Sequence, residues 1–443
     1  MKFNYINFPF SPAKFPVYYG WVILFVAVIG MLMSVPGQTI GFSAFTEPLL
    51  RSLQIDRTHL SYAYLIGTLI NGLFIARVGR LYDRYGARIL GIFAGLAFGI
   101  VLLFLSNIDH IIYLIYDTLK PESPELITFI MMSFGFFSLR FMGQGVLTMV
   151  SKNIVMKWFE KHRGLVNGIL AVSISFGFSY SPKVLDALIQ HHTWQGTWKI
   201  LALVTGVFFV LLAAVFFRDN PEECGLLPDG NPGNDEKKNI RAVIKNFSLT
   251  EAKKTYAFWI FNLTLVINGL YLTGFTFHVE DVFNNAGMGR EVALSIFLPS
   301  AIIAVIFNFI GSALSDYIKL KYLLIAEITG LIIAMAGLIL LKTHTFAYWC
   351  IVIGNGLSQG MFGILNNVTW PKFYGIRSLG AISGYSLGWV VAGTALGPSL
   401  FSISVKNFEH YGYASGVCLV VSLILFFMAF KADNKNETFV HSA

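Results

Sequence analysis

"LITFIMMSFGFFSLRFMGQGVLTMV", residues 126–150, contains a single charged side chain, that of Arg140. The 443-residue chain around it is 55% hydrophobic and 13% charged and includes 41 phenylalanines. This is more apolar surface than one water-soluble core can bury. Because a bilayer core needs about 20 apolar residues in a helix, the stretch predicts a membrane-spanning helix that carries a charge.

Eleven more runs share this length and composition. The twelve predicted spans are residues 18–45, 60–76, 89–108, 126–150, 164–182, 200–217, 255–277, 292–315, 322–341, 345–371, 378–405 and 411–430. Arg140 and Glu327 are the only charges inside these runs, and Glu327 lies close enough to Lys321 that we expect it to reach the headgroups. The predicted fold class is an all-α membrane protein with twelve transmembrane helices in two six-helix pseudo-repeats.

The positive charges are distributed unequally between alternate loops. Of the 32 lysines and arginines, 23 fall in the tails and loops on the side of the two termini, eight fall on the other side, and Arg140 belongs to neither. By the positive-inside rule both termini are cytoplasmic. The net charge of +8 then reports topology and contact with the anionic inner leaflet of a plasma (inner) membrane, and no nucleic-acid partner is expected.

A polar segment at 218–254 divides six predicted helices from six. It predicts a cytoplasmic linker between an N-terminal bundle, residues 1–217, and a C-terminal bundle, residues 255–443. An internal repeat supports this division, because shifting the second half back by 215 residues places Gln359 on Gln144 and Asn355 on Arg140. Duplicated bundles of this kind occur in secondary transporters, which bind substrate near the midplane between the repeats.

The loop "GRLYDRYGARIL", residues 79–90, resembles the signature loop of the major facilitator superfamily, with one departure at Ala87. The matching residues are Gly79, Leu81, Asp83, Arg84, Gly86 and Arg88. A second loop, "SALSDYIKLK" at 312–321, keeps Asp316 but lacks both glycines. The resemblance implies the twelve-helix major facilitator fold, and it implies that these loop residues form a cytoplasmic gate. Without this resemblance, the charges in these loops would indicate only how the chain is oriented in the membrane.

The segment "KWFEKHRGLVNGI", residues 157–169, is similar to that of monocarboxylate transporters and oxalate/formate antiporters. This similarity implies a small organic anion as substrate. Members of that group often place a basic residue in the eighth or eleventh helix, and the runs 292–315 and 378–405 contain none. Arg140 is the candidate replacement.

Arg140 lies about 21 Å along the predicted helix 126–150, near the membrane midplane. A central arginine disfavours membrane insertion by about 2.5–3.5 kcal/mol unless it faces a cavity or a partner. Its planar guanidinium can bind a carboxylate with two parallel hydrogen bonds. The alternative is an arginine that bonds helix carbonyls and staples two helices together.

Other polar residues predict a substrate site beside Arg140. In "SVPGQTIGFSAF", residues 34–45, Pro36 and Gly37 should break the helix and expose Gln38, or Gln38 could satisfy the carbonyls that the kink frees. Candidate residues on the repeat-related helices are Gln144, Asn355 and Gln359. Some of these amides are expected to hold helices together instead.

Three ionisable residues, His278, Glu280 and Asp281, follow the run 255–277 and should lie at its outer rim. Histidine titrates near pH 6.5, so this group is a candidate for proton coupling or for an outer gate. An interfacial histidine without a transport role is the alternative.

The sequence contains no phosphate-binding loop, nucleophile pair or metal-ligand cluster. We therefore expect no enzyme, cofactor or metal, and we expect a gradient-driven transporter that functions as a monomer by alternating access. The expected partners are a small organic anion, protons and the lipid bilayer. A carrier or exporter of neutral or cationic compounds is the alternative within transport, and a non-transporting sensor of the same fold is the alternative outside it.

Overall fold

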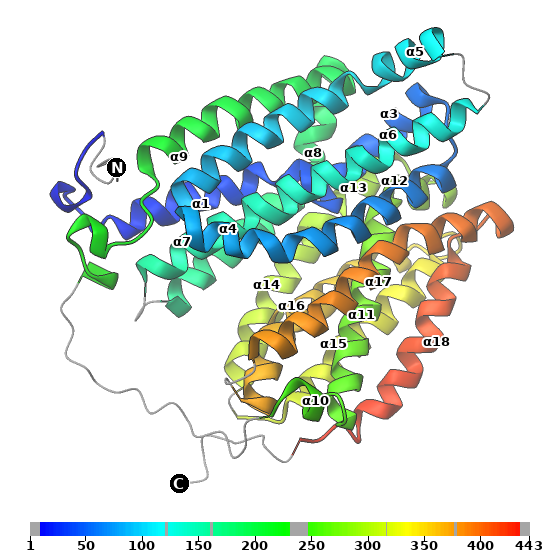
Figure 1. The fold of residues 1–443 in the computed structure, drawn as a ribbon. Helices are drawn as coiled ribbons and strands as arrows, with labels where there is room; N and C mark the ends of the chain where they lie inside the picture. The colour runs from blue at the N-terminus through cyan, green and yellow to red at the C-terminus, as the bar shows by residue number, and fades with distance from the viewer. Residues whose placement is uncertain are drawn as a thin grey trace. The chain divides into compact units, whose positions relative to one another are not determined.

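The computed structural model describes residues 9–119, 123–159, 163–230, 247–315, 317–375 and 379–434. These residues form helices and no strands, which confirms the all-α class. The chain divides into two compact units, Met1–Glu236 and Lys237–Ala443 (Figure 1).

The first unit is built mainly from nine α-helices. They are α1 (Gly20–Met33), α2 (Thr39–Phe42), α3 (Thr46–Leu53), α4 (Arg57–Ser106), α5 (Ile108–Leu119), α6 (Pro124–Leu139), α7 (Thr148–Trp158), α8 (Arg163–Leu203) and α9 (Val210–Phe216). The 3₁₀ turns are η2 (Pro12–Lys14), η3 (Val35–Gly37), η4 (Ser43–Phe45), η7 (Glu222–Cys224) and η8 (Pro228–Gly230), and the π-helical segments are η5 (Arg140–Leu147) and η6 (Val204–Phe209).

The second unit continues the same kind of architecture. Its helices are α10 (Leu249–Ala252), α11 (Tyr256–Phe277), α12 (Val279–Asn285), α13 (Arg290–Ser295), α14 (Phe297–Leu314), α15 (Leu320–Leu340), α16 (Ala347–Tyr374), α17 (Leu379–Phe408) and α18 (Gly412–Ala429).

Two long helices of the first unit are each two spans joined at a sharp backbone turn. The helix α4 turns at Gly86, where φ is 79°, and α8 turns at Thr193, where φ is 62°. The arms of α4 contain the run 60–76 and the run 89–108 as far as Ser106. The first arm of α8 contains the run 164–182, and its second arm continues through η6 and α9, which together contain the run 200–217 as far as Phe216. In the part of the chain that the structure describes, all twelve predicted runs therefore lie in helical segments, and eight helices are long and apolar enough to cross a membrane.

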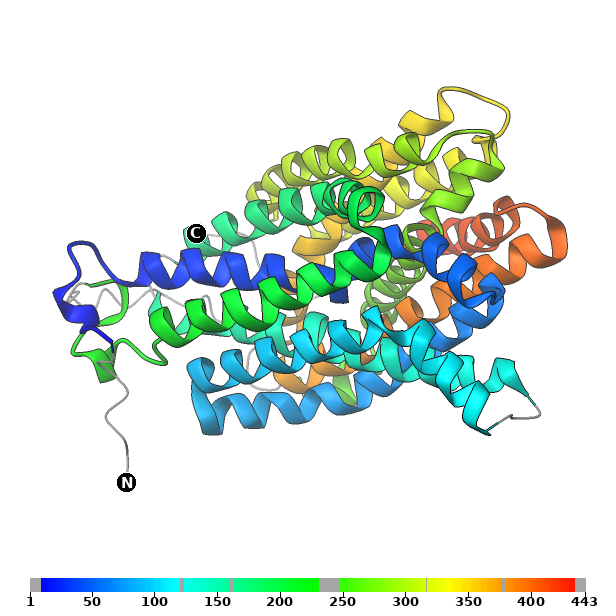
Figure 2. The same cartoon turned by 90° about the horizontal axis from the view of Figure 1, so that it is seen from above.

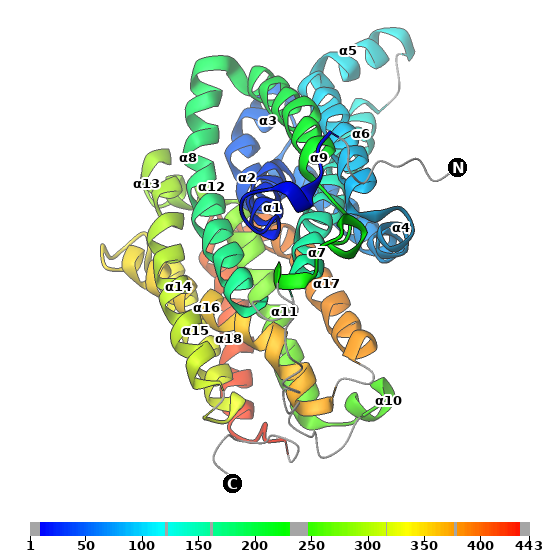
Figure 3. The same cartoon turned by 90° about the vertical axis from the view of Figure 1, so that its left-hand side faces the viewer.

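Small residues bring the helices of each unit close together. In the first unit α4 packs along α6 (Figure 2), and a methyl group on Gly99 would lie 2.8 Å from the Cα of Gly206 in η6. In the second unit α15 lies beside α16 and α18 (Figure 3). A methyl group on Gly354 would lie 2.6 Å from the carbonyl oxygen of Gly330. Such contacts let helix backbones approach where lipid supplies no hydrophobic driving force.

Large apolar side chains also point outward from the helices. Phe25 is 67% exposed, Ile100 67% and Phe427 70%. Lipid tails are the solvent that accepts such side chains, so the outer surface agrees with helices that are embedded in a bilayer.

Candidate functional site

Two irregular backbone segments meet inside the first unit. The 3₁₀ turn η3 ends at Gly37, where the first span is interrupted, and the π-helix η5 begins at Arg140. A methyl group on Gly37 would lie 2.7 Å from the carbonyl oxygen of Leu139 and 2.8 Å from the Cα of Gly143, so only glycine permits this contact. Single-turn π-helices inside α-helices frequently mark functional sites.

Arg140 is buried at this junction, with 4% of its surface exposed. Its Nη1 donates to Thr39 Oγ1 at 3.1 Å, and its guanidinium carbon lies 4.8 Å from the centre of the Tyr64 ring. The Thr39 and Tyr64 hydroxyls are themselves 2.8 Å apart. Among the described residues, Arg140 has no carboxylate partner and its Nε has no hydrogen bond. Thr39 and Tyr64 hold the guanidinium in place, and its Nε–H remains available to donate a hydrogen bond.

The two glutamines of the first unit lie on either side of this junction. Gln38 Nε2 donates to Ser34 Oγ at 3.2 Å and to Thr148 Oγ1 at 3.4 Å, so it bridges the broken span and α7. Gln144 is half-buried within η5. The structure thus brings Gln38, Arg140 and Gln144 onto two segments in contact, as a shared site requires.

The two candidates of the second unit both lie on α16. Asn355 is buried, and its Oδ1 has no hydrogen-bond partner among the described residues. Gln359 is half-buried and donates from Nε2 to Asn268 Oδ1 on α11 at 2.7 Å.

The placement of Glu327 corrects the sequence analysis. Its side chain is fully buried and does not reach the headgroups, and its Oε1 accepts a hydrogen bond of 2.8 Å from Asn268 Nδ2. Distance along the chain from Lys321 gave the wrong environment because it ignored the direction of the side chain. Leu320, Leu324 and Leu331, which are fully buried, lie on the same helix stripe as Glu327.

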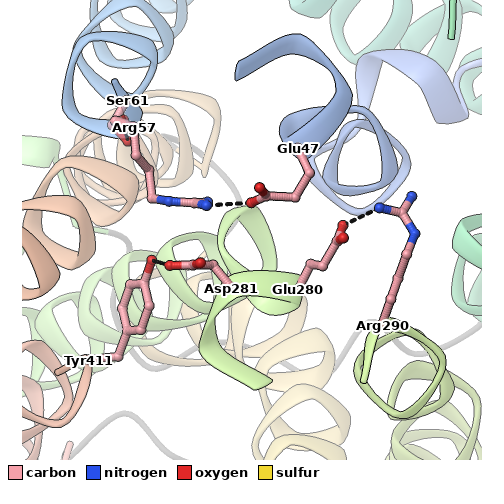
Figure 4. A network of polar contacts seen from close by, with 7 residues as sticks. All are labelled: Glu47, Arg57, Ser61, Glu280, Asp281, Arg290 and Tyr411. Carbon is pink, nitrogen blue, oxygen red and sulfur yellow. Dashed lines mark hydrogen bonds and ion pairs between the residues drawn. The ribbon is translucent and has the colours of Figure 1, made fainter. Parts of the chain in front are cut away.

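The cluster after α11 is a set of internal contacts of the second unit (Figure 4). Glu280 forms an ion pair with Arg290, and the hydroxyl of Tyr411 donates to Asp281 Oδ2 at 2.5 Å. His278 follows the last residue of α11 and is 1% exposed, and its Nε2 lies 2.8 Å from the carbonyl oxygen of Pro398. These contacts tie α12 to the segments that begin α13 and α18.

The first unit contains a matching ion pair. Glu47 of α3 pairs with Arg57 at the start of α4 (Figure 4), and in both units the partners are ten residues apart. Glu280 lies as many residues after Glu47 as Arg290 lies after Arg57, so the two pairs occupy matching positions in the two halves of the sequence. Each pair fastens the end of the first span of its unit to the start of the second.

The signature loop turns at Gly86, between the arms of α4. Asp219, beyond the end of α9, accepts a hydrogen bond from the backbone N–H of Arg88 at 2.9 Å and thereby caps the second arm. A methyl group on Gly86 would lie 2.1 Å from Asp219 Oδ2, and φ is positive there. Burial raises the pKa of the Asp219 carboxyl despite these backbone N–H donors.

Two arginines satisfy the carbonyls at the end of α9. Arg88 Nε donates to the carbonyl of Ala214 at 2.9 Å, and Arg218 Nη1 donates to those of Val215 and Phe217 at 2.8 Å each. Cations at a helix C-terminus are stabilised by its dipole. Burial is the main cause that lowers the pKa of Arg218. The signature Arg88 therefore fastens α4 to α9.

The other signature residues are described in part. Arg84 is exposed, with its guanidinium carbon 5.3 Å from the centre of the Tyr85 ring. Gly79 and Asp83 are described in their backbone alone, and Asp316 lies outside the described residues.

Sequence reasoning missed Asp219, the π-helix η5 and the Asn268 to Glu327 hydrogen bond. The helix arm after a glycine-centred turn needs a cap, and an acidic residue two positions beyond the run 200–217 was a usable signal for Asp219. The buried leucine stripe of the run 322–341 was a signal for Glu327. Nothing in the composition of residues 140–147 distinguishes a π-helix from an α-helix.

Comparisons with known proteins agree with this architecture. The profile of the Major Facilitator Superfamily matches residues 22–398. "MFS-type transporter 1" of Ophiocordyceps sp. (strain BCC 1869) is 32% identical over 137 residues, which cover 31% of this chain and 26% of that relative's length.

Solved structures are similar in fold at low identity. A bacterial homologue of the human lysosomal transporter Spinster, inward-facing and occupied, has a TM-score of 0.67 and 14% identity, covering 96% of this chain and 100% of its own. The nucleoside transporter NupG has a TM-score of 0.64 and 14% identity, and covers 93% of this chain and 98% of its own.

The fold is that of a multi-pass integral membrane protein. The profile match spans most of the sequence, so the chain belongs to the Major Facilitator Superfamily. This confirms the twelve-helix fold class, and the family is one of transporters and not of enzymes.

Proposed function

We propose that this protein is a secondary active transporter of a small organic anion, a carboxylate, which it moves together with protons by alternating access. Arg140 is the observation that carries the proposal. It is a cation buried in a membrane-spanning segment, with an unpartnered Nε and no acidic partner among the described residues. A buried cation without a counter-ion is unfavourable unless a ligand supplies the charge.

The environment of Arg140 suits a carboxylate. Thr39 accepts a hydrogen bond from Nη1, and the guanidinium lies over the Tyr64 ring. The remaining N–H donors suit a planar acceptor with two oxygens. Gln38 and Gln144 on the adjoining segments can bond the rest of a small polar solute. In the repeat, Asn355 and Gln359 are the proposed counterparts of Arg140 and Gln144.

The ionisable cluster after α11 is assigned to the outer gate. Glu280 and Asp281 are engaged by Arg290 and Tyr411, and the matching Glu47 to Arg57 pair supports a role at the same end of the other repeat. Opening and closing of such pairs is a suitable two-state event for alternating access.

The proposed location and topology rest on the distribution of positive charges along the chain. We place the protein in the plasma (inner) membrane as a monomer, with both termini and the linker 218–254 in the cytoplasm, because 23 of the 32 lysines and arginines fall on that side. Asp83 and Asp316 in the two signature loops would then latch the cytoplasmic side.

The test is uptake by purified protein in liposomes, with radiolabelled L-lactate and oxalate as probes and an inward proton gradient. We expect the gradient to drive accumulation of at least one carboxylate, and a thermal-shift screen to show stabilisation by carboxylates. Sugars, amino acids and lipophilic cations form the comparison panel. Stabilisation and uptake confined to cations or sugars would contradict the anion proposal and favour the alternative carrier.

A further inference from the structure

A three-residue polar chain runs through the second unit from a half-buried position to a fully buried one. Gln359 Nε2 on α16 donates to Asn268 Oδ1, and Asn268 Nδ2 on α11 donates to Glu327 Oε1 on α15. The two distances are 2.7 and 2.8 Å. Gln359 is half-buried, whereas Asn268 and Glu327 are 1% and 0% exposed.

The inner end of this chain is open to one more hydrogen bond. Glu327 Oε2 is buried and has no partner among the described residues. An ionised carboxylate accepts at both oxygens, whereas a protonated carboxyl donates from one of them. Because Oε1 already accepts from Asn268, Oε2 is the oxygen that is available to carry a proton.

No described cation neutralises Glu327. On α15 itself, Lys321 Nζ bonds Asp433 Oδ2 at 2.7 Å, and on α16 Lys372 Nζ bonds the carbonyl of Ser315 at 2.6 Å. The other titratable groups on α15 and the helices packed against it are Tyr322 on α15, Tyr256 and Tyr271 on α11, Tyr348, Cys350 and Tyr374 on α16, and Tyr413 and Cys418 on α18. All of these are uncharged when protonated, so they cannot serve as counter-ions.

An isolated carboxylate in an apolar interior is strongly unfavourable, and a group in that position takes up a proton instead. We infer that Glu327 is a proton-binding site of the transport cycle, filled while Gln359 and Asn268 close over it and emptied when that contact opens. This inference rests on the proposed proton-coupled transport and adds the residue that carries the proton. The coupled proton then binds inside the helix bundle and not at His278, whose Nε2 contacts the Pro398 carbonyl oxygen.

A purely structural role for Glu327 makes a different prediction. As a staple between α11 and α15, it would affect stability but would not titrate near neutral pH or link uptake to a proton gradient. The experiment therefore combines a spectroscopic readout with transport.

The first measurement is the infrared difference spectrum of wild-type protein in liposomes between pH 6 and pH 9. We expect a carboxylic acid C=O band that disappears as the pH rises. It should be absent in Glu327→Gln, shifted in frequency in Glu327→Asp, and unchanged in Thr329→Val. Thr329 lies on the same helix, and its hydroxyl donates to the backbone carbonyl of Ile325, so this variant is a matched control.

The second measurement compares exchange with accumulation, using L-lactate and oxalate. Glu327→Gln mimics the protonated form, so exchange at equal pH should stay within about twofold of wild type. One coupled proton lets a gradient of one pH unit drive about tenfold accumulation, and this should be lost in Glu327→Gln and kept in Thr329→Val.

Three outcomes would overturn the inference. The first is a C=O band that persists in Glu327→Gln. The second applies if Glu327→Gln does not fold, and is a C=O band in Glu327→Asp that is identical to the wild-type band. The third is gradient-driven accumulation of substrate by Glu327→Gln. In this last case the proposed function survives. If wild type carries neither carboxylate but the band depends on Glu327, the choice of substrate fails and the proton site stands.

Discussion

Arg140 combines burial, a cation and spare hydrogen-bonding capacity, and these properties predict how its variants behave. Arg140→Lys keeps the charge but loses the planar fork, so carboxylate uptake should fall about tenfold or more without vanishing. Arg140→Gln should abolish uptake. Both variants should fold, because Arg140→Lys leaves the buried charge as it is in the wild type and Arg140→Gln removes an unpaired charge and so relieves a desolvation penalty. Expression, melting temperature and uptake measured side by side check this.

The stapling role predicts the opposite order of damage. Loss of the hydrogen bond to Thr39 and of the contact with the Tyr64 ring would then make Arg140→Gln unstable or poorly inserted. An Arg140→Gln protein that transports at the wild-type rate would remove the residue from the site.

Cys224 offers a second test at the scale of one residue. It is buried, and burial raises the pKa of its thiol to about 11. At pH 8 only about one thiol in a thousand is ionised, so alkylation should be at least about a hundredfold slower than for an exposed cysteine. Because the pKa in the folded protein is raised, the thiol destabilises the fold only as the pH rises from 9.0 toward 11.

The rate of maleimide labelling in a Cys350→Ala, Cys418→Ala background measures this reactivity. Glu222→Cys with Cys224→Ser in the same background is the matched control, since residue 222 is exposed on the same turn. Equal labelling rates at pH 8 would show that Cys224 is not in this environment.

At the scale of elements, the sequence predicted every span but not its internal geometry. Run length and hydropathy locate a helix because the bilayer requires an apolar segment with satisfied backbone bonds. The proline and glycine at 36 and 37 likewise predicted the break that η3 makes. The π-helix at Arg140 was not predictable, because it depends on how η3 and η5 fit together through Gly37 and Gly143.

The candidate site was predicted in part for the same reason. Charged and amide side chains are rare in apolar runs, and the sequence alone shows where they occur, so it predicted Arg140, Gln38 and Gln359 as site residues. The partners Thr39, Asn268 and Glu327 follow from helix rotation and packing, which only the folded unit fixes.

The turn between the arms of α4 gives a test of one element. Gly86→Ala should lower stability by at least about 2 kcal/mol, because the new methyl group meets Asp219 in addition to the strain of a positive φ. Gly225→Ala is the control, since Gly225 also has a positive φ of 74° but no atom within 4 Å of the added carbon. Its cost should be about 1 kcal/mol.

Thermal unfolding in detergent compares the two variants. Adding Asp219→Ala to Gly86→Ala should recover part of the loss, because it removes the colliding carboxylate. If the two single variants unfold at the same temperature, the Asp219 contact contributes nothing to the turn.

At the scale of the whole molecule, alternating access needs a latch that changes the balance of states without touching the substrate. The match of residues 79–90 to the superfamily loop assigns this role to Asp83. Asp83→Asn should slow interconversion of inward-open and outward-open states, while substrate affinity stays within a few-fold. Conformation-sensitive fluorescence and binding isotherms separate the two quantities. Lost binding with normal interconversion would argue against the latch.

Charge distribution makes the last prediction, which concerns how the whole chain is oriented. Each lysine or arginine near the membrane surface contributes about 1 kcal/mol of attraction to an anionic leaflet, and the predicted tails and loops carry 23 positive charges on one side against eight on the other. Both termini and the linker 218–254 should therefore be cytoplasmic. A reporter fused after Ala443 that is active only in the cytoplasm should signal, and a periplasmic or extracellular reporter should stay silent. The same reporters fused after Leu53, between the first two spans, should give the reverse result, and a signal of the same kind at both positions would contradict the topology.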